Sequence, residues 1–527
     1  MNMKKIFTKI LTVSLAGLAL SSCNLDLFPE ATIIYDPSQP FYYYENDVEA
    51  AHSTVYTYFR SNVGGADAYI TDLALQGFNA HINFGNRLGD IHRTDESYNT
   101  SSQTVEGYWA AYYSSIKNYN VIIEAAESAA DKEFYDRAVY VKGEALIARA
   151  YTYLQLARLF GTDYVTDPSA PCVPLVLKYD QNERPAAATM EQVYAQIAQD
   201  LDDARQILES EKSAEWLPKN AVSAQYFTTD VISFLQARVL LDSGEYEAAA
   251  DTAMAIYNRG VYSFSADAAA LKALNSKDKG TEAIMQPFTS RDEKPGSYNI
   301  FIGKSSSKFS ASGFYYQPDF LPSQVLLEAY DNTDFRRQAW FELTGTDAEM
   351  TPIVGADVPT SSAGFIGGVN IFAKYKGNLA YTTNDIENGL VAPKPFLVSE
   401  LLLIAAEGYY RAGVQDKANI ALKQLQAKRN ASLRNCSEES LNKEWFRETI
   451  GEGLYMSYLK RAHLGYEGRS GQPNALSNAL LSTSLSSYLD KSVDPDTVEG
   501  ARVYTWPVPA YELRCNPNLK QNPVWAN

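Results

Sequence analysis

The chain has 527 residues and a net charge of −17, and this composition argues against several classes of protein. An acidic surface repels phosphate backbones, so we expect no nucleic-acid partner. The four cysteines are too few for a disulfide framework and include no Cys-x-x-Cys pair, so a zinc ribbon is not expected. One disulfide between two of the residues Cys172, Cys436 and Cys515 is possible, and the sequence does not say which pair would form it.

The first 22 residues have the order of a secretory signal peptide. Lys4, Lys5 and Lys9 precede an apolar stretch over residues 10–20, and two serines then lead to Cys23. Ending on a cysteine resembles a bacterial lipoprotein signal, which implies a mature chain that begins at Cys23 and carries acyl chains there. The alternative is an ordinary secreted protein with a chance cysteine. No later apolar run reaches the ~20 residues of a membrane-spanning helix, so we expect a protein that is anchored to a membrane without crossing it.

Two helices are predicted in the first half of the chain. Residues 144–160 are rich in Ala, Leu and Arg, and their apolar residues recur at three- and four-residue steps. Gly161 then offers a C-terminal stop. Thr189 and Gln192 have the spacing of a capping box, which predicts a second helix from there to about Leu208.

Two later segments share one pattern. In residues 237–248 and again in residues 406–418, a glycine follows an alanine by seven positions and precedes a second Ala-containing stretch. This helix, Gly turn and helix resembles a tetratricopeptide repeat, in which small residues let paired helices approach closely. The alternative is any Ala-rich helical hairpin.

Long stretches between these helices are expected to be irregular. They cover about residues 64–107, 286–322 and 345–395, and they mix aromatic residues with Asn, Asp, Ser and Gly. Long loops in a compact protein are usually functional or disordered, and the interspersed aromatic residues argue against disorder.

Taken in chain order, segments of this sequence resemble the SusD/RagB family of outer-membrane lipoproteins over nearly the whole mature chain. The matching residues are Cys23 with 25–29; Trp109, Tyr112, Tyr113, Ile116 and Asn120; 144–145, 149–151, 159–161 and 173–176; 322–324, Leu327, 330–331, Asp334 and 336–337; 401–407; and the tail 506–509, 512–513, 516–517 and 521–523. One region departs from the family pattern, because residues 450–461 match it only at Glu452 and the pair Lys460 and Arg461.

The resemblance implies a mainly α fold: a helical scaffold with tetratricopeptide-like helix pairs and long irregular loops that carry a few short strands. After the signal peptide (1–22), residues 23–527 would form the SusD-like protein, with an N-terminal part of about 23–230 and a C-terminal part of about 270–527. It also implies a lipid-anchored protein, exposed at the cell surface on the outer membrane, that acts as a lid on a SusC-like TonB-dependent transporter. Such a protein captures glycans, or in some branches peptides, and needs no cofactor or metal.

Binding a sugar requires an aromatic plane for the C–H face of the ring and polar side chains for its hydroxyls. Two loop stretches supply both kinds of residue, and long loops on a rigid frame commonly carry binding sites. The candidates are Phe78, Asn79, His81, Phe84 and Arg87 in the first stretch, and Tyr298, Phe314, Tyr315 and Tyr316 in the second. For any one aromatic residue, burial against the helices is the competing interpretation.

A surface glycosidase is the competing class of function, although we expect that the protein is not an enzyme. It needs two carboxylates across a cleft, and candidates such as Asp72, Asp90 or Asp319 are not specific in a chain with 63 acidic residues. The four histidines show no HExxH spacing, and neither a phosphate-binding loop nor a GxSxG elbow is present. A structural protein that only plugs a transporter is the third class.

Overall fold

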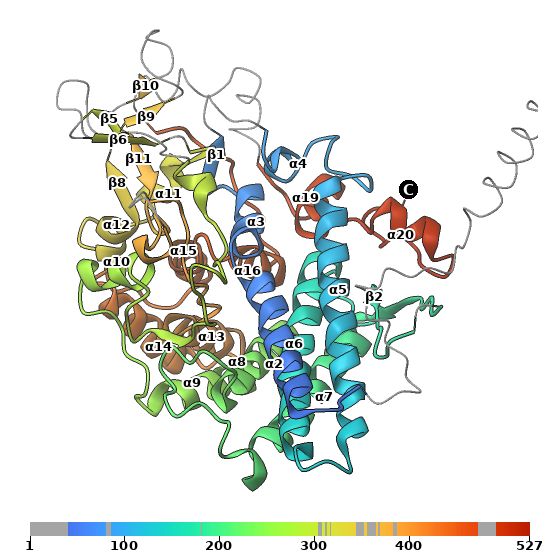
Figure 1. Ribbon diagram of the computed structural model, residues 1–527. Coiled ribbons are helices and arrows are strands. Elements are labelled where there is room, and N and C mark those ends of the chain that lie inside the picture. The colour runs from blue at the N-terminus through green and yellow to red at the C-terminus, as the bar shows by residue number, and fades with distance from the viewer. Residues whose placement is uncertain are drawn as a thin grey trace, which may run out of the picture.

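The computed structural model describes residues 41–80, 86–180, 182–303, 308–310, 313–316, 318–343, 353–355, 365–366, 369–382, 387–472 and 492–526. These residues form a mainly α-helical fold with short strands, as predicted (Figure 1). None of the described helices is long and apolar enough to cross a membrane. Cys23 and the predicted signal peptide lie outside the described residues.

The first half of the chain builds a layer of long helices around α6. The layer consists of α2 (Glu45–Val63), α5 (Gln103–Ala125), α6 (Tyr135–Phe160) and α7 (Met190–Leu208), and α6 packs against the other three. Most residues of α6 are buried, as expected for a helix enclosed on several sides. The predicted helix at residues 144–160 is therefore confirmed, but it begins earlier, at Tyr135. The predicted capping box is present, since the Gln192 amide donates to Thr189 Oγ1 and the Thr189 amide donates to Gln192 Oε1.

The two predicted helix pairs are confirmed and stack on each other. They are α8 (Thr229–Asp242) with α9 (Tyr246–Asn258), and α13 (Val398–Arg411) with α14 (Gln415–Lys428), and α9 packs against α13. The turns depend on Gly244 and Gly413, whose φ angles of 86° and 77° favour glycine. At Gly408 a Cβ atom would lie 2.4 Å from the Tyr246 carbonyl oxygen, so a glycine permits this close helix contact. In Figure 1 the two pairs lie at the lower left.

The strands are short and lie mostly beside the later loops. Their sheets are β1 (Phe78–Ala80) with β7 (Phe320–Pro322); β5 (Lys308–Ser310), β6 (Gly313–Tyr316), β9 (Ile353–Gly355) and β10 (Phe365–Ile366); β8 (Phe341–Leu343) with β11 (Asn370–Phe372); β4 (Ala283–Met285) with β12 (Phe396–Leu397); and β2 (Pro171–Pro174) with β3 (Ala187–Thr189). The expectation that residues 64–107 are irregular is wrong in part. This stretch contains α3 (Ala66–Ala74) and α4 (Gly89–Arg93), and α3 is held by the burial of Tyr69, Ile70 and Leu73.

Buried arginines join segments that are far apart in the sequence. Arg336, at the start of α12 (Phe335–Trp340), contacts Asp334 and donates from Nη1 to Glu448 Oε2 at 2.6 Å. Arg429, after α14, binds Glu282 at 2.7 and 2.8 Å and also Glu448 at 2.6 Å. We call this set the arginine network; its members are Glu282, Asp334, Arg336, Arg429, Glu444 and Glu448, the last two from α15 (Glu438–Glu448). Burial would raise the pKa of Glu448, but Arg429 and Arg336 lower it to about 2.

A second buried network links four helices. Arg461, on α16 (Tyr455–Ala462), donates to Asp242 Oδ1 at 2.7 Å and to Glu407 Oε2 at 2.9 Å. Arg158, on α6, completes the Asp242 carboxylate with a bond of 2.8 Å to Oδ2. The ammonium of Lys460 donates to the carbonyls of Arg158 and Gly161. The basic pair that matched the family pattern therefore ties α16 to α6, α8 and α13.

A glycine-containing turn before α16 is hydrogen-bonded to α3. The Asp72 carboxylate accepts the Gly451 amide at 2.8 Å and the Gly453 amide at 3.1 Å, through Oδ2 in both cases. The φ angles of these glycines are 79° and 68°, and a Cβ on Gly453 would lie 2.6 Å from the Ala68 carbonyl oxygen. Asp72 is 1% exposed, and burial raises its pKa to about 7. The turn thus needs glycine where the sequence departs from the family pattern.

The C-terminal tail packs back onto the first helical layer. Trp506 is buried against Phe160, and its amide donates to the Leu159 carbonyl at 2.7 Å. The Asn522 side chain donates to the Trp506 carbonyl at 2.8 Å. One contiguous hydrophobic core includes residues from both predicted parts of the chain, and the division near residues 230–270 stays a prediction. Cys172, Cys436 and Cys515 are free.

Replacing Arg336 with Met tests the arginine network. The change removes a cation from three buried carboxylates, those of Asp334, Glu444 and Glu448. Glu444 and Glu448 keep Arg447 and Arg429 as partners, whereas Asp334 keeps only a 3.8 Å contact with Arg447. We expect the free energy of unfolding in urea to fall by about 3–5 kcal/mol, because a buried charge without its partner is strongly destabilising. Lys212→Ala, which removes an exposed ion pair with Asp136, is the control and should leave the urea midpoint unchanged. Equal midpoints for both variants would contradict the role of the network.

Asp72 gives stability a pH dependence with a defined sign. Its pKa is about 7 in the folded protein and about 3.9 in an unfolded chain, so the folded state binds more protons between these values. The free energy of unfolding therefore falls as the pH rises from about 4 to 7. Asp72→Asn keeps an acceptor for both glycine amides, and we expect it to flatten the pH profile by about 1–3 kcal/mol. Urea titrations at pH 5 and pH 8, with the exposed change Glu211→Gln as control, measure this; an unchanged slope would refute it.

Candidate functional site

Arg87 is the half-exposed member of the first predicted binding stretch, in which the structure also describes Phe78 and Asn79. Its Nε donates to Asp319 Oδ2 at 2.6 Å, and its Nη1 donates to Asn299 Oδ1 at 2.9 Å. The Arg87 side chain is 46% exposed, so donors remain available to solvent or a ligand. Burial raises the pKa of Asp319, and the neighbouring Arg87 opposes this rise. The structure thus brings Arg87 together with two polar side chains from the second loop stretch.

Three predicted binding residues are buried. Phe78 is 0% exposed, and its ring centroid lies 4.6 Å from that of Phe301 and 5.1 Å from that of Phe372. Asn79 is buried and donates to the Ser470 carbonyl at 2.9 Å. Tyr298 stacks on Tyr375 with centroids 4.0 Å apart. Phe78 and Asn79 are thus buried in this structure, which favours the competing interpretation of burial for these two residues, and their contact with a ligand stays a prediction. Tyr298 lines an internal pocket.

The remaining candidates are described in part or not at all. Phe314, Tyr315 and Tyr316 lie in β6, which pairs antiparallel with β5 and parallel with β9, and this sheet is at the upper left of Figure 1. His81 and Phe84 lie outside the described residues. For these five residues ligand contact stays a prediction.

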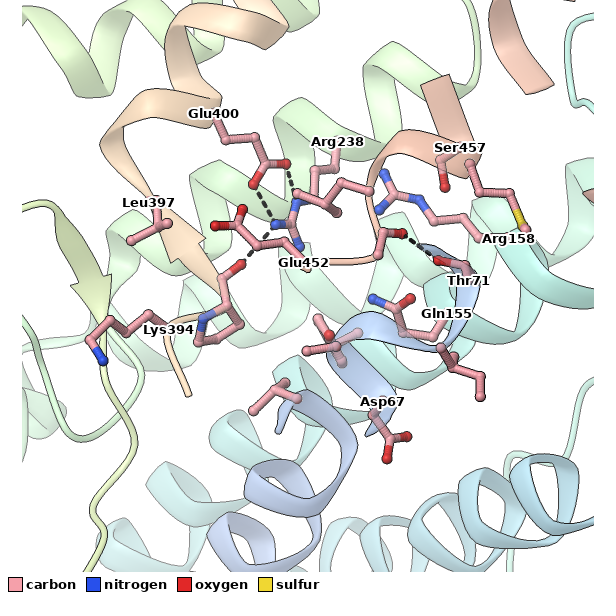
Figure 2. A pocket seen from close by; sticks show the side chains of 18 of the residues that line it. Asp67, Thr71, Gln155, Arg158, Arg238, Lys394, Leu397, Glu400, Glu452 and Ser457 are labelled. Atoms are coloured by element: carbon pink, nitrogen blue, oxygen red, sulfur yellow. Dashed lines mark hydrogen bonds and ion pairs between the residues drawn. The ribbon is translucent and has the colours of Figure 1, made fainter. Parts of the chain in front are cut away.

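An internal pocket lies where α3, α6 and α8 meet the segments before α13 and α16 (Figure 2). The space open to the centres of water molecules is about 60 Å³. At about 10–15 Å³ for each water, this space suits a small water cluster and not a polysaccharide chain. Tyr298 lines it together with Tyr112, Tyr151 and Tyr375. Composition alone gave no signal for this pocket, because its residues come from nine separate segments.

Most charged groups around the pocket are paired. Arg238 donates to both carboxylate oxygens of Glu400, at 2.6 and 2.7 Å (Figure 2). It also donates to the Pro395 carbonyl at 2.8 Å. Lys394 pairs with Asp278 at 2.7 Å, and burial lowers its pKa. Glu452 pairs with Lys374 at 2.7 Å. These pairs neutralise the walls, so the pocket has the character of a hydrated interior site.

Asp67 is the exception among the charged groups of the pocket. Within the described part of the chain it makes no ion pair, and burial raises its pKa to about 7 although a hydrogen bond with Tyr112 lowers it. A carboxyl with such a pKa can act as a general acid, but a glycosidase needs a cleft that admits the glycosidic bond between two carboxyls. The narrow pocket does not provide that cleft.

The acidic residues considered for catalysis have structural contacts. Asp72 holds the glycine turn, and Asp319 pairs with Arg87. Asp90 accepts bonds from the hydroxyls of Ser102 and Thr104 near the start of α5. In the described residues no group of three or more His, Cys, Asp or Glu side chains could hold a metal ion.

Family models match both halves of the chain. One, described as "Starch-binding associating with outer membrane", matches residues 50–229, and one described as the SusD family matches residues 396–525. Together these ranges span more than half of the chain. No curated protein matches the sequence.

Solved structures share the fold over nearly their whole length. A SusD superfamily protein from Bacteroides thetaiotaomicron has a TM-score of 0.70 at 20% identity, covering 90% of this chain and 99% of that one. A SusD-like carbohydrate binding protein from Bacteroides vulgatus has a TM-score of 0.67 at 19% identity, covering 90% and 97%. A laminarin-binding SusD-like protein has a TM-score of 0.65 at 17% identity, covering 92% and 100%. With the family models, this shared helical architecture leads to one conclusion: the chain belongs to the SusD/RagB family.

Proposed function

We propose that this protein is a cell-surface lipoprotein that binds glycans and delivers them, as a lid, to a SusC-like TonB-dependent outer-membrane transporter. The observation that carries the proposal is the match of both halves to starch-binding and SusD family models. Neighbours of the same fold are described as carbohydrate- and laminarin-binding, which supports a glycan as the ligand. A peptide ligand for the same kind of lid is the alternative.

The surface chemistry fits capture better than catalysis. Arg87, Asp319 and Asn299 form a half-exposed polar cluster of the kind that binds sugar hydroxyls. The carboxylates that a glycosidase would need are tied to structural partners or face a pocket too small for a glycan. Pure protein incubated with polysaccharides should release no new reducing ends, and their appearance would favour the surface glycosidase instead.

We expect Tyr315 and Tyr316 to stack on sugar rings. Replacing both with Ala should weaken binding about tenfold, since each stacked ring contributes about 0.5–1.5 kcal/mol. A glycan array first identifies a ligand for protein that starts at Asn24, and calorimetry then compares the variants. Tyr43 and Tyr44, an adjacent pair of exposed tyrosines outside the loops, give the matched control when replaced with Ala. Unchanged affinity in the Tyr315 and Tyr316 variant would remove these residues from the site.

The lipid anchor is part of the proposal. Acyl chains at Cys23 would hold the protein at the membrane, and residues 24–40 would act as a leash that lets the lid swing. Cys23→Ala should release folded protein that still binds its glycan but no longer supports uptake by cells. Uptake that survives release would contradict the lid role while leaving glycan binding intact.

A further inference from the structure

A groove lies on the flank formed by α10 (Ala268–Ser276), α12 and the end of α14. Its volume is about 850 Å³, within the range of ligand sites, which is about 300–1,000 Å³. None of the residues predicted to bind glycans lines it. The lining residues that matter below are Phe264, Asp267, Phe335, Gln338, Lys428 and Asn430.

The groove combines apolar rings with exposed polar groups. Phe264 and Phe335 are half-buried, so part of each side chain faces the groove while the rest packs on the core. Gln338, Lys428 and Asn430 are exposed and supply amide and ammonium donors as well as amide acceptors. Flat apolar surface beside such groups matches the C–H faces and hydroxyls of a sugar chain.

The floor of the groove is fixed by the arginine network. The Arg429 guanidinium carbon lies 4.9 Å from the centroid of the Phe264 ring, and the Ser265 amide donates to Glu282 Oε1 at 2.7 Å. On the opposite wall, the Phe335 amide donates to the Arg429 carbonyl at 3.2 Å. Asn430 donates to the Thr333 carbonyl at 2.8 Å and so ties the end of α14 to the start of α12. A groove held in this way costs little ordering free energy when a ligand binds.

The charges of the groove define the class of ligand. Asp267 and Lys428 carry opposite charges, and they are the only ionisable residues among those that line the groove in the described structure. An acidic glycan or a phosphate ligand would need an excess of cations, which this lining lacks. The balance favours an uncharged chain of hydroxyls.

We propose that this groove is a second binding site, which holds a segment of a neutral polysaccharide. The inference rests on the proposed glycan-binding function. It adds a second point of contact, on the helical flank, for a chain that also binds at the loops. Two such contacts on one polysaccharide raise the overall affinity well above that of either site.

Filling the groove tests the proposal. Ala427 and Ala269 are exposed residues of the lining, and Ala427→Trp would occupy the groove without removing any buried contact. Affinity electrophoresis in gels that contain soluble starch or laminarin compares this variant with wild type, using protein that starts at Asn24. One of the two polysaccharides is expected to retard wild type in the gel. We expect Ala427→Trp to bind that polysaccharide about tenfold more weakly than wild type does. Ala248→Trp, at an exposed alanine of α9 outside the groove, should bind like wild type.

A second variant separates a loss of binding from a loss of folding. Gln338→Ala combined with Lys428→Ala removes exposed polar groups only, and its urea midpoint should equal that of wild type. It should also weaken polysaccharide binding, whereas normal binding by both this variant and Ala427→Trp would overturn the groove site and leave the proposed function standing. If wild type binds no glycan on the array, or binds only peptides, the proposed function and the groove site fall together.

Discussion

The pairing of Arg336 and Arg429 with buried carboxylates is the constraint on which the later half of the fold depends. Moving an ion into a protein interior costs several kcal/mol, and this cost is offset only where the partners meet in good hydrogen-bonding geometry. Here Glu448 bridges both arginines, and Glu282 occupies the two Nη atoms of Arg429. A shift of Arg336 would leave Asp334 with only a 3.8 Å contact to Arg447, and a shift of Arg429 would separate it from Glu282. The network therefore acts mainly by fixing geometry, although breaking it is costly.

Its members show what that geometry fixes. Glu282 precedes β4, Arg429 ends α14, and Glu448 lies on α15, so three segments from different parts of the chain share one set of bonds. The second network does the same for α6, α8, α13 and α16 through Arg461 and Asp242. Apolar packing between Ala-rich helices is tolerant of small shifts, whereas paired charges are directional. The helix pairs supply the area of contact, and the ion pairs select one arrangement.

Local sequence signals predict much of this helical scaffold. The Ala-to-Gly spacing predicted both helix pairs, because a turn with positive φ needs glycine and close helices need small residues. The capping box at Thr189 likewise marked the start of α7. Local signals failed where distant segments decide the structure. Helix α3 is formed by residues that also suit a loop, and it is held by Asp72, whose partners lie almost 380 positions later.

The candidate site was less predictable for a related reason. An aromatic residue between polar neighbours suits a binding loop and a buried anchor equally well, and only the packing of Phe78 on Phe301 and Phe372 separates the two. The tyrosines show the same ambiguity. Many have a buried ring and a hydroxyl bonded to a distant segment, such as Tyr56 to Glu144 and Tyr466 to the Ala74 carbonyl. Their abundance therefore reflects packing between helices as much as ligand recognition.

One stretch of chain connects the frame to both candidate binding surfaces. Asp319, just before β7, pairs with Arg87 at the loop face, and Phe335, at the start of α12, lines the groove on the flank. Arg336 follows Phe335 directly in the chain and is 0% exposed, and its partners Asp334, Glu444 and Glu448 are buried as well. The bonds of Arg336 to Asp334, Glu444 and Glu448 hold the start of α12 against α15. The same buried charge that restricts the fold thus also holds the groove wall that carries Phe335, on the flank where we propose that a polysaccharide binds.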